Sequence, residues 1–438
     1  MIRLRRTVLA IGTSAALVLS AAPAAHALGP FPQNPTRSGD AGVVSTSEKM
    51  ELVGGNGAWR ADATKFTYSS TDSMGRPSID RATYIEPRTP WKGPGPRPLV
   101  AIAPGTQGPG EHCDPSSTAA TGIHVGMTPP DLGVGYEMLP AAENLSRGAA
   151  VVIIDHHRNP DTGSQEYADN ISSGQSMLDA AVAARGLGVD PAAPVGLYGY
   201  SQGGSTSGWA AENAHRYAPD LNVVASTVGA PPSNLIEVLD TIDGSILSAA
   251  VAYAINGVLG KDEELRRKIT EEELNDAGRA WLKSSDGLCI GGAVLDSGFR
   301  STRDFTADGS SLKEVIEARY PEVLEELARQ KLGKDVPDHP TMVYGGIGDD
   351  IIPINQIREL NADWTGKGAD VTYVEDNTPA IPGKVGVNHI APMLSQLLPA
   401  IDFLWAHFSP EPSTPIPGAP GSLTPQLPSQ SELPGLSR

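Results

Sequence analysis

The feature that most constrains this chain is a glycine-rich hexapeptide, Gly199-Tyr200-Ser201-Gln202-Gly203-Gly204. It follows an apolar run at 194–199 that has the composition of a buried strand, and it precedes a helical pattern over 204–215. A serine on such a sharp turn is exposed at the start of the helix, and the glycines avoid clashes with neighbouring backbone. The motif therefore predicts a strand–turn–helix unit that presents Ser201 as a reactive group. An ordinary glycine-rich turn is the alternative.

Further apolar runs bounded by Gly, Pro or Asp predict the other strands of the sheet. They lie at 98–103, 150–154, 222–228, 341–344 and 370–374. Continuous apolar runs without alternation are typical of parallel strands that are buried on both faces. Because helical patterns such as 174–184 separate them, we expect an α/β fold with a mostly parallel sheet flanked by helices.

One region, 233–338, interrupts the alternation of strands and helices. Its patterns are helical over 235–259, 263–282 and 312–332, with no clear buried strand. We therefore expect a helical cap at 233–338, inserted into a core formed by 28–232 and 339–408. Ligands of open α/β sheets bind outside the carboxyl ends of the strands, so the cap would cover the site.

Ser201 needs a base and an acid that follow it in the sequence, because a serine hydroxyl is a weak nucleophile until its proton is removed. His389 is the expected base, since it lies in a Gly/Asn-rich loop after the last strand and before an apolar helix at 391–408. The other histidines after Ser201 fall in less suitable places (His215, His339 and His407). Either Asp349 or Asp350, after the strand at 341–344, could orient the imidazole.

An oxyanion on the reacting group also needs backbone donors. One expected donor is the amide of Gln202, which follows the serine directly. The second should come from the loop after the strand at 98–103, where Thr106 and Gln107 are both candidates and a surface turn is the alternative. No cofactor is required by chemistry of this kind.

The two ends of the chain differ in composition from the rest. Residues 1–27 have the basic start, apolar stretch and Ala25-His26-Ala27 ending of a cleaved signal peptide, with a retained membrane anchor as the alternative. Residues 409–438 are rich in proline and contain no aromatic residue, so we expect a disordered tail, either a spacer near a cell wall or a neutral appendage. We therefore expect a secreted, extracellular protein.

Export also affects how the two cysteines are interpreted. Cys113 and Cys289 are the only cysteines among 438 residues, and a pair in an oxidising compartment predicts a disulfide rather than free thiols. They are too few for a four-thiolate zinc site or an iron–sulfur cluster. Asp155-His156-His157 could suggest a metal, but adjacent histidines point in different directions, so we expect it to line the cavity and expect no metal.

Composition excludes one class of partner and leaves another open. The net charge of −18 argues against nucleic acid, because a phosphate backbone selects basic surfaces. With 39% hydrophobic residues the chain can bury a large core. The apolar cap favours a small-molecule ester or lipid as the partner, with transient contact to a lipid surface, and no obligate protein partner is inferred.

Several motifs together resemble the secretory lipase family of the lipase A type, whose members are α/β-hydrolases. The resemblance rests on the Ser201 hexapeptide and four other segments: 105–108, 217–223, 229–232 and 349–353. In that family the acid stands four residues before a proline, which selects Asp349. The chain departs from the family at Asp155-His156-His157, where a glycine-containing Asp-Tyr motif is usual.

The resemblance implies a secreted serine ester hydrolase, a lipase or esterase whose substrates could include triacylglycerols. Ser201 would attack, His389 would transfer the proton and Asp349 would orient His389. Two alternatives remain at this point. One is an acyltransferase that uses the same three residues on cell-envelope lipids, and the other is a non-catalytic cell-wall scaffold.

Overall fold

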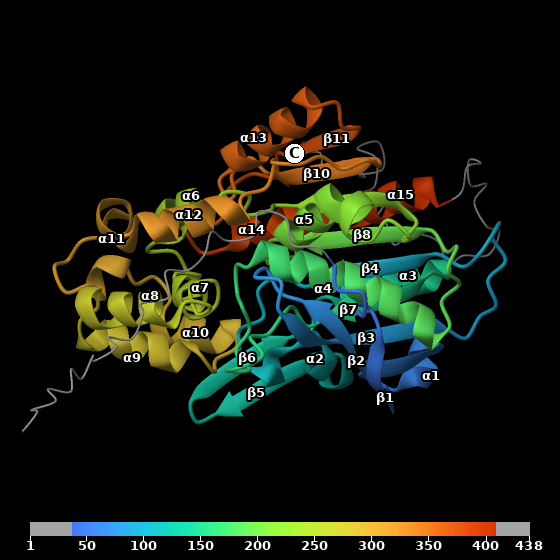
Figure 1. Ribbon diagram of the computed structural model, residues 1–438, viewed down its shortest axis with the longest axis horizontal. Coiled ribbons are helices and arrows are strands. Elements are labelled where there is room, and N and C mark those ends of the chain that lie inside the picture. Colours follow the sequence, from blue (N-terminus) through green and yellow to red (C-terminus); the bar gives the residue numbers. More distant parts are fainter. Residues whose placement is uncertain (1–36, 409–438) are drawn as a thin grey trace, which may run out of the picture.

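One nine-stranded sheet forms the body of the protein in the computed structural model, which describes residues 37–408 (Figure 1). The strand order is β1-β2-β3-β7-β4-β8-β9-β10-β11. The expected signal peptide and proline-rich tail lie outside the described residues. The six apolar runs form the parallel part of the sheet: β4 (Leu99–Ala103), β7 (Ala150–Ile154), β8 (Val195–Tyr200), β9 (Val223–Gly229), β10 (Thr341–Gly346) and β11 (Val371–Asp376). The predicted α/β class and mostly parallel sheet are confirmed.

Three antiparallel strands that the sequence patterns did not predict extend the sheet at one edge. They are β1 (Val44–Met50), β2 (Ala61–Thr71) and β3 (Pro77–Pro87), and β3 pairs with β7. A separate hairpin consists of β5 (Ile123–Met127) and β6 (Pro130–Val134). It projects from the same end of the molecule as the first strands (Figure 1).

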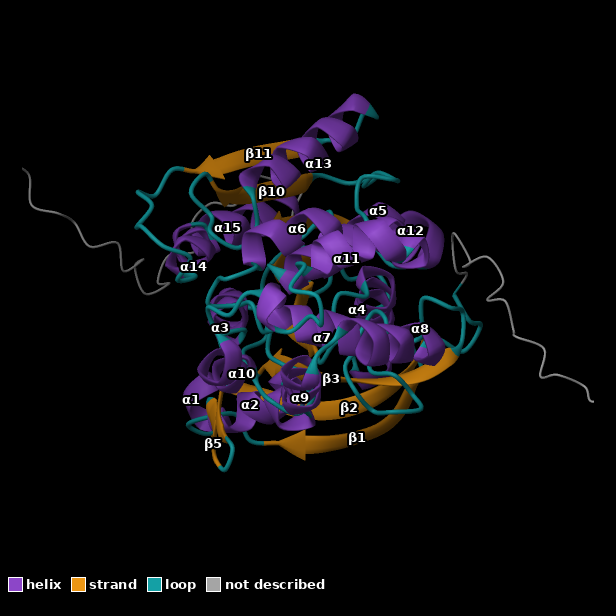
Figure 2. Ribbon diagram, turned by 90° about the vertical axis from the view of Figure 1, so that its left-hand side faces the viewer, coloured by secondary structure: helices purple, strands orange, loops and turns teal. Residues whose placement is uncertain are grey.

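Helices cover both faces of the sheet. Figure 2 shows α3 (Met138–Arg147) and α15 (Leu397–His407) on one side, and α4 (Asn170–Ala183) and α5 (Gln202–Tyr217) on the other. The remaining helices of the body are α1 (Asn56–Trp59), α2 (Pro115–Thr121), α13 (Ile354–Gly366) and α14 (Val387–Ser395). The central strands β4, β7, β8 and β10 are completely buried between these layers, which explains their unbroken apolar composition.

The cap region contributes helices and no strand to the nine-stranded sheet. Its α-helices are α6 (Leu235–Ile242), α7 (Ala250–Asn256), α8 (Glu263–Lys268), α9 (Asp276–Ser285), α10 (Ile290–Ser297), α11 (Leu312–Arg319) and α12 (Pro321–Gln330). In Figure 1 they form a lobe beside one end of the sheet. The cap has two apolar clusters of its own, and one of them includes Ile351 and Ile352 from the loop after β10.

Each of the long helices expected from periodicity is broken in the structure. The stretch 235–259 is interrupted after α6, where Gly244 has φ +70°. Asn275 caps a new helix inside 263–282 by accepting a hydrogen bond from the Gly278 amide, 2.9 Å away. Pro321 begins α12 inside 312–332. Periodicity therefore identified the helical region correctly, and local caps and turns determined where each helix ends.

Two further observations concern the disulfide and the search for membrane-spanning helices. The predicted disulfide is present, because Cys113 Sγ and Cys289 Sγ are 2.10 Å apart, and it joins the body to the residue that precedes α10 of the cap. Within residues 37–408, no helix has both the length and the apolar composition that crossing a bilayer requires.

Candidate active site

Ser201 lies on a strained turn between β8 and α5, as the hexapeptide predicted. Its φ of 58° and ψ of −123° lie outside the helical and strand regions. A Cβ at Gly199 would lie 1.9 Å from the Gly203 carbonyl oxygen, and one at Gly203 would lie 2.1 Å from the Ala103 carbonyl oxygen. Only glycine allows the strand, the turn and the helix to approach this closely, and the approach holds Ser201 at the end of the sheet.

His389 lies between Ser201 and Asp349. Its Nε2 is 2.9 Å from the Ser201 Oγ, and its Nδ1 is 2.8 Å from Asp349 Oδ2. An ionised carboxylate only accepts hydrogen bonds, so Nδ1 carries the proton and Nε2 is left to accept the serine hydroxyl. His389 belongs to the first turn of α14, so the expectation that it lies in the preceding loop was wrong.

The backbone around this trio holds both the acid and the imidazole in place. The Asp349 side chain is fully buried, and its Oδ1 accepts the amides of Ile351 and Ile352 at 2.9 and 2.8 Å. The Tyr200 hydroxyl donates to the carbonyl of His389 at 2.6 Å. Both groups are therefore oriented before any substrate arrives.

The structure places the two candidate aspartates differently, and Asp349, which the family resemblance selected, lies against His389. Only Asp349 contacts the His389 ring, whereas Asp350 Oδ2 accepts the amide of Gly386 at 2.8 Å. Gly386 is the residue before α14 and has φ +78°. Asp350 thus anchors the turn that starts the helix of His389, while Asp349 contacts the imidazole itself.

The candidate oxyanion donors differ in their surroundings. Gln202 is the first residue of α5, where amides have no partner inside the helix, and it lines the same cavity as Ser201 and Thr106. Gln107 is buried outside that cavity, and its Nε2 donates to both oxygens of Glu137 at 2.7 Å. Burial raises the pKa of Glu137 to about 8. Gln107 can therefore offer the site only its backbone.

A cavity extends from Ser201 into the cap. Its wall is mostly aliphatic side chains from the cap helices and the loop after β10: Leu235, Val238, Leu239, Ile242, Leu247, Val251, Ile255, Val258, Leu259, Leu312, Ile316, Val323, Leu327, Ile351 and Ile352. The few polar groups include Thr106, whose hydroxyl is 2.8 Å from that of Tyr167. Such a space favours an apolar ligand with one polar end at the serine.

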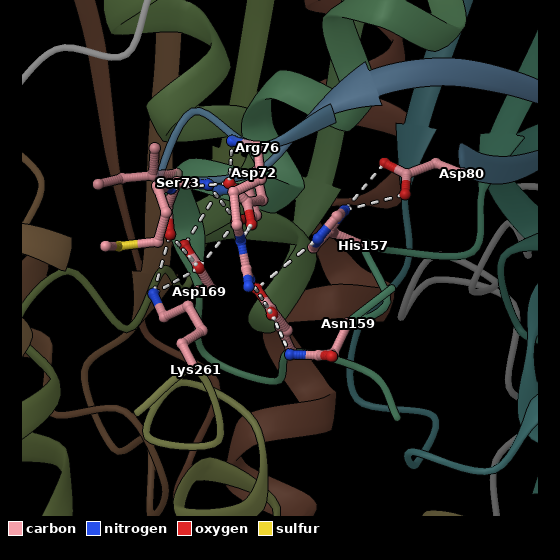
Figure 3. A network of polar contacts seen from close by, with 12 residues as sticks. Asp72, Ser73, Arg76, Asp80, His157, Asn159, Asp169 and Lys261 are labelled. Carbon is pink, nitrogen blue, oxygen red and sulfur yellow. Dashed lines mark hydrogen bonds and ion pairs between the residues drawn. The ribbon is translucent and has the colours of Figure 1, made fainter. Parts of the chain in front are cut away.

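The expectation that His156 and His157 line the cavity was wrong. Both are buried outside its wall. His156 Nε2 donates to the carbonyl of Pro104 at 2.8 Å, and burial lowers its pKa to about 4, which keeps the ring neutral. His157 Nδ1 is 2.9 Å from Asp80 Oδ1 (Figure 3). Each histidine has one ring nitrogen bound to a group of the body, and a tripeptide read from the sequence does not reveal these partners.

A buried ionic cluster joins the cap to the body, and sequence reasoning missed it. Lys261 Nζ, from the cap, lies 2.7 Å from Asp169 Oδ2 and 2.9 Å from the Ser73 hydroxyl of the body (Figure 3), and 2.8 Å from Glu326 Oε1. Although burial raises the pKa of Asp169, the charges of Lys261 and Arg329 outweigh it and hold that pKa well below its usual range. No local pattern signals a pairing between residues so far apart in sequence.

Comparison with known proteins agrees with this geometry. Residues 127–415 match the model of the family described as secretory lipase. The chain belongs to the secretory lipase family. It is 30% identical to a protein named probable inactive lipase from Mycobacterium tuberculosis over 72% of this chain and 68% of that protein. It is 24% identical to Lipase 10 of Candida albicans over 80% and 73% of the two chains.

Membership of the secretory lipase family is consistent with the observed fold. The crystal structure of Candida antarctica lipase A in its closed state superposes with a TM-score of 0.69, at 20% identity, over 87% of this chain and 85% of that one. The chain therefore has the lipase fold, and family membership supports a lipase-type hydrolase.

Proposed function

We propose that this protein is a secreted carboxylic-ester hydrolase, a lipase or esterase that uses Ser201, His389 and Asp349. The observation that carries the proposal is the Ser201–His389–Asp349 chain of contacts opening into a cavity with aliphatic walls. The polar head of an ester would meet Ser201, and its acyl chain would enter the cap. Substrates would range from short-chain esters to triacylglycerols. Family membership supports an extracellular location.

In the proposed mechanism His389 Nε2 takes the proton of Ser201 as Oγ attacks the ester carbonyl carbon. The negative charge that develops on the carbonyl oxygen would be stabilised by the backbone amides of Gln202 and of the loop at Thr106 and Gln107. His389 then protonates the leaving alcohol, and the acyl group remains on Ser201. A water molecule, deprotonated by His389, attacks the acyl carbon; the bond to Ser201 Oγ breaks, His389 returns the proton to Oγ, and the acid is released. Asp349 keeps the imidazole oriented and stabilises its charged form throughout.

Two other functions are compatible with the fold and predict different results. An acyltransferase would pass the acyl group from Ser201 to an alcohol instead of water. A scaffold would not react at all, and one relative carries the name of a probable inactive lipase. The contact of 2.9 Å between His389 and Ser201 argues against the scaffold, because an inactive chain has no need of it.

The test is labelling with a fluorophosphonate probe, which reacts only with an activated serine. We expect the wild type to be labelled and Ser201→Ala to be unlabelled. Ser205→Ala is the matched control, since Ser205 lines the same cavity but donates to the carbonyl of Gln202 rather than contacting His389. Absence of labelling in the wild type, or labelling of Ser201→Ala, would overturn the enzyme proposal.

Product analysis separates hydrolysis from transfer. The enzyme is given an ester together with a long-chain alcohol in water, and free acid is compared with the new ester. Free acid as the main product supports the hydrolase. A predominance of transferred acyl groups would assign the acyltransferase function instead.

A further inference from the structure

Three possible metal ligands meet at the projecting hairpin, away from the serine. His112 belongs to a 3-10 turn (Glu111–Cys113), His124 lies on β5 and Asp131 lies on β6 (Figure 1). The two imidazole rings lie with their centroids 4.3 Å apart. Neither the proposed mechanism nor the cavity uses any of these residues.

We propose that His112, His124 and Asp131 form a zinc site. Asp131 Oδ2 is 3.0 Å from His112 Nε2 and 3.6 Å from His124 Nε2, and the ligand atoms of the group all lie within 4.8 Å of one another. Tetrahedral zinc bonds of about 2.0–2.2 Å place neighbouring ligand atoms about 3.3–3.5 Å apart. The three side chains therefore need only small rotations to bind one ion.

The carboxylate is oriented toward the imidazoles by its own partners. Asp131 is 6% exposed, and its Oδ1 accepts the amides of Leu132 at 2.9 Å and Cys289 at 3.0 Å. A Cβ at Gly292 would lie 2.2 Å from Oδ1, so this position leaves room for the carboxylate only as glycine. With Oδ1 occupied, Oδ2 is the atom that faces the histidines. Hydrogen-bonded support of this kind behind a ligand is usual in metal sites.

The imidazoles are accessible from solvent. The side chains of His112 and His124 are 43% and 29% exposed, which leaves a path for an ion and a position for water as a fourth ligand. Within residues 37–408 the His124 ring makes no hydrogen bond; it lies against the His112 ring, and its Nε2 is 3.6 Å from Asp131 Oδ2.

The donor set is one that zinc commonly uses, and it does not suit calcium. Two imidazoles and one carboxylate suit zinc, whereas calcium requires six to eight oxygen ligands. The Cys289 sulfur is nearby but belongs to the disulfide with Cys113, so it supplies no thiolate. The site therefore has three protein ligands in the oxidised protein.

Zinc bound here would stabilise the junction between the hairpin, the disulfide and the cap. Asp131 binds the amide of Cys289, and the next amide, that of Ile290, donates to the carbonyl of Gln107 at 2.8 Å. The ion would thus fix the segment that supports the loop of the candidate oxyanion donors. A ligand that binds only the folded state raises the midpoint of thermal unfolding.

The test uses untagged protein with its disulfide intact, stripped of metal with EDTA and titrated with zinc in a calorimeter. We expect one zinc per chain and an upward shift of a few degrees in the unfolding midpoint. The double variant His112→Asn/His124→Asn should lose this binding and this shift. The matched control His215→Asn, at an exposed histidine of α5, should keep both.

Cobalt substitution gives a second readout. Co²⁺ in a tetrahedral site absorbs strongly in the visible range, and we expect this spectrum in the wild type but not in the double variant. Probe labelling at Ser201 in every variant checks that the proteins are folded. A wild type that binds no zinc, or a double variant that binds zinc as tightly as the wild type, would overturn the proposal.

Discussion

The sheet body and the cap meet at Ser201 but constrain their residues very differently. In the body, backbone oxygens would lie 1.9–2.1 Å from any Cβ at Gly199 or Gly203, so these two positions accept only glycine. In the cap, the cavity wall consists of interchangeable aliphatic side chains. The chemistry of the proposed site therefore depends on exact contacts in the body. In the proposed function, the choice of acyl group would depend on the volume that the cap leaves free.

The largest effect should follow from removing the acid of the body. Asp349→Asn places an amide against His389 and favours the wrong tautomer, so we expect kcat for ester hydrolysis to fall by about 10⁴-fold. Asp350→Asn is the matched change one residue away. This change should lower kcat by at most about tenfold, because a single hydrogen bond to Gly386 contributes about 0.5–1.5 kcal/mol. Equal losses in steady-state rates would contradict the assignment of the two aspartates.

The next largest effect concerns the ionic cluster between body and cap. Lys261→Met removes the ion pair of the buried Asp169, while Glu326 keeps its contact with Arg329 at 2.7 Å, and breaking such a buried pair costs about 3–5 kcal/mol. Urea denaturation at neutral pH measures this loss. Lys283→Met, at an exposed lysine of the cap, should be nearly neutral. If both variants unfold alike, the cluster does not hold the cap on the body.

The polar interior of the body should also make its stability depend on pH. Burial lowers the pKa of His157, but Asp80 and Glu166 outweigh it and raise that pKa from 6.5 to about 9. The charged ring therefore stabilises the fold fully below pH 6.5, and its contribution is lost as the pH rises through about 9. His157→Gln should lower the free energy of unfolding by about 1.5–3 kcal/mol below pH 6.5 and by less above pH 9.

The measurement for His157 is the difference in unfolding free energy between the two proteins at several pH values. Glu166, whose pKa burial raises to about 7, titrates in the same range, so the wild-type curve alone is not sufficient. A difference that does not change with pH would show that the ring acts through packing rather than through its charge.

The smallest effect should come from the cap wall. Ala254→Phe on α7 narrows the cavity, and we expect the kcat/KM for long-chain esters to fall about tenfold relative to short-chain esters. Ala277→Phe, at an exposed position of α9, adds the same bulk outside the cavity and should leave the ratio unchanged. A ratio that also stays constant in Ala254→Phe would mean that acyl chains bind elsewhere.

The fold could be predicted wherever one segment carried its own signal. The six strands of the parallel part of the sheet form apolar runs, and all six were found by that pattern, although β11 lies at the edge and is partly exposed. The antiparallel strands β1–β3 were missed because their polar and apolar residues are mixed and their partners are distant in the sequence. The long cap helices were predicted without their breaks, since periodicity continues across a turn such as the one at Gly244.

The sequence by itself determined the strand–turn–helix unit around Ser201. Its strand, glycine turn and helix are adjacent in the chain, and their close approach excludes side chains at the glycine positions. The sequence also led to His389 through the order of the segments and to the pairing of the only two cysteines. The family resemblance had selected Asp349 over Asp350, but only the tertiary structure placed Asp349 against His389, buried His157 beside Asp80 and brought His112 and His124 to Asp131. These contacts join segments that are separate in the chain, and their distances depend on how the whole molecule packs.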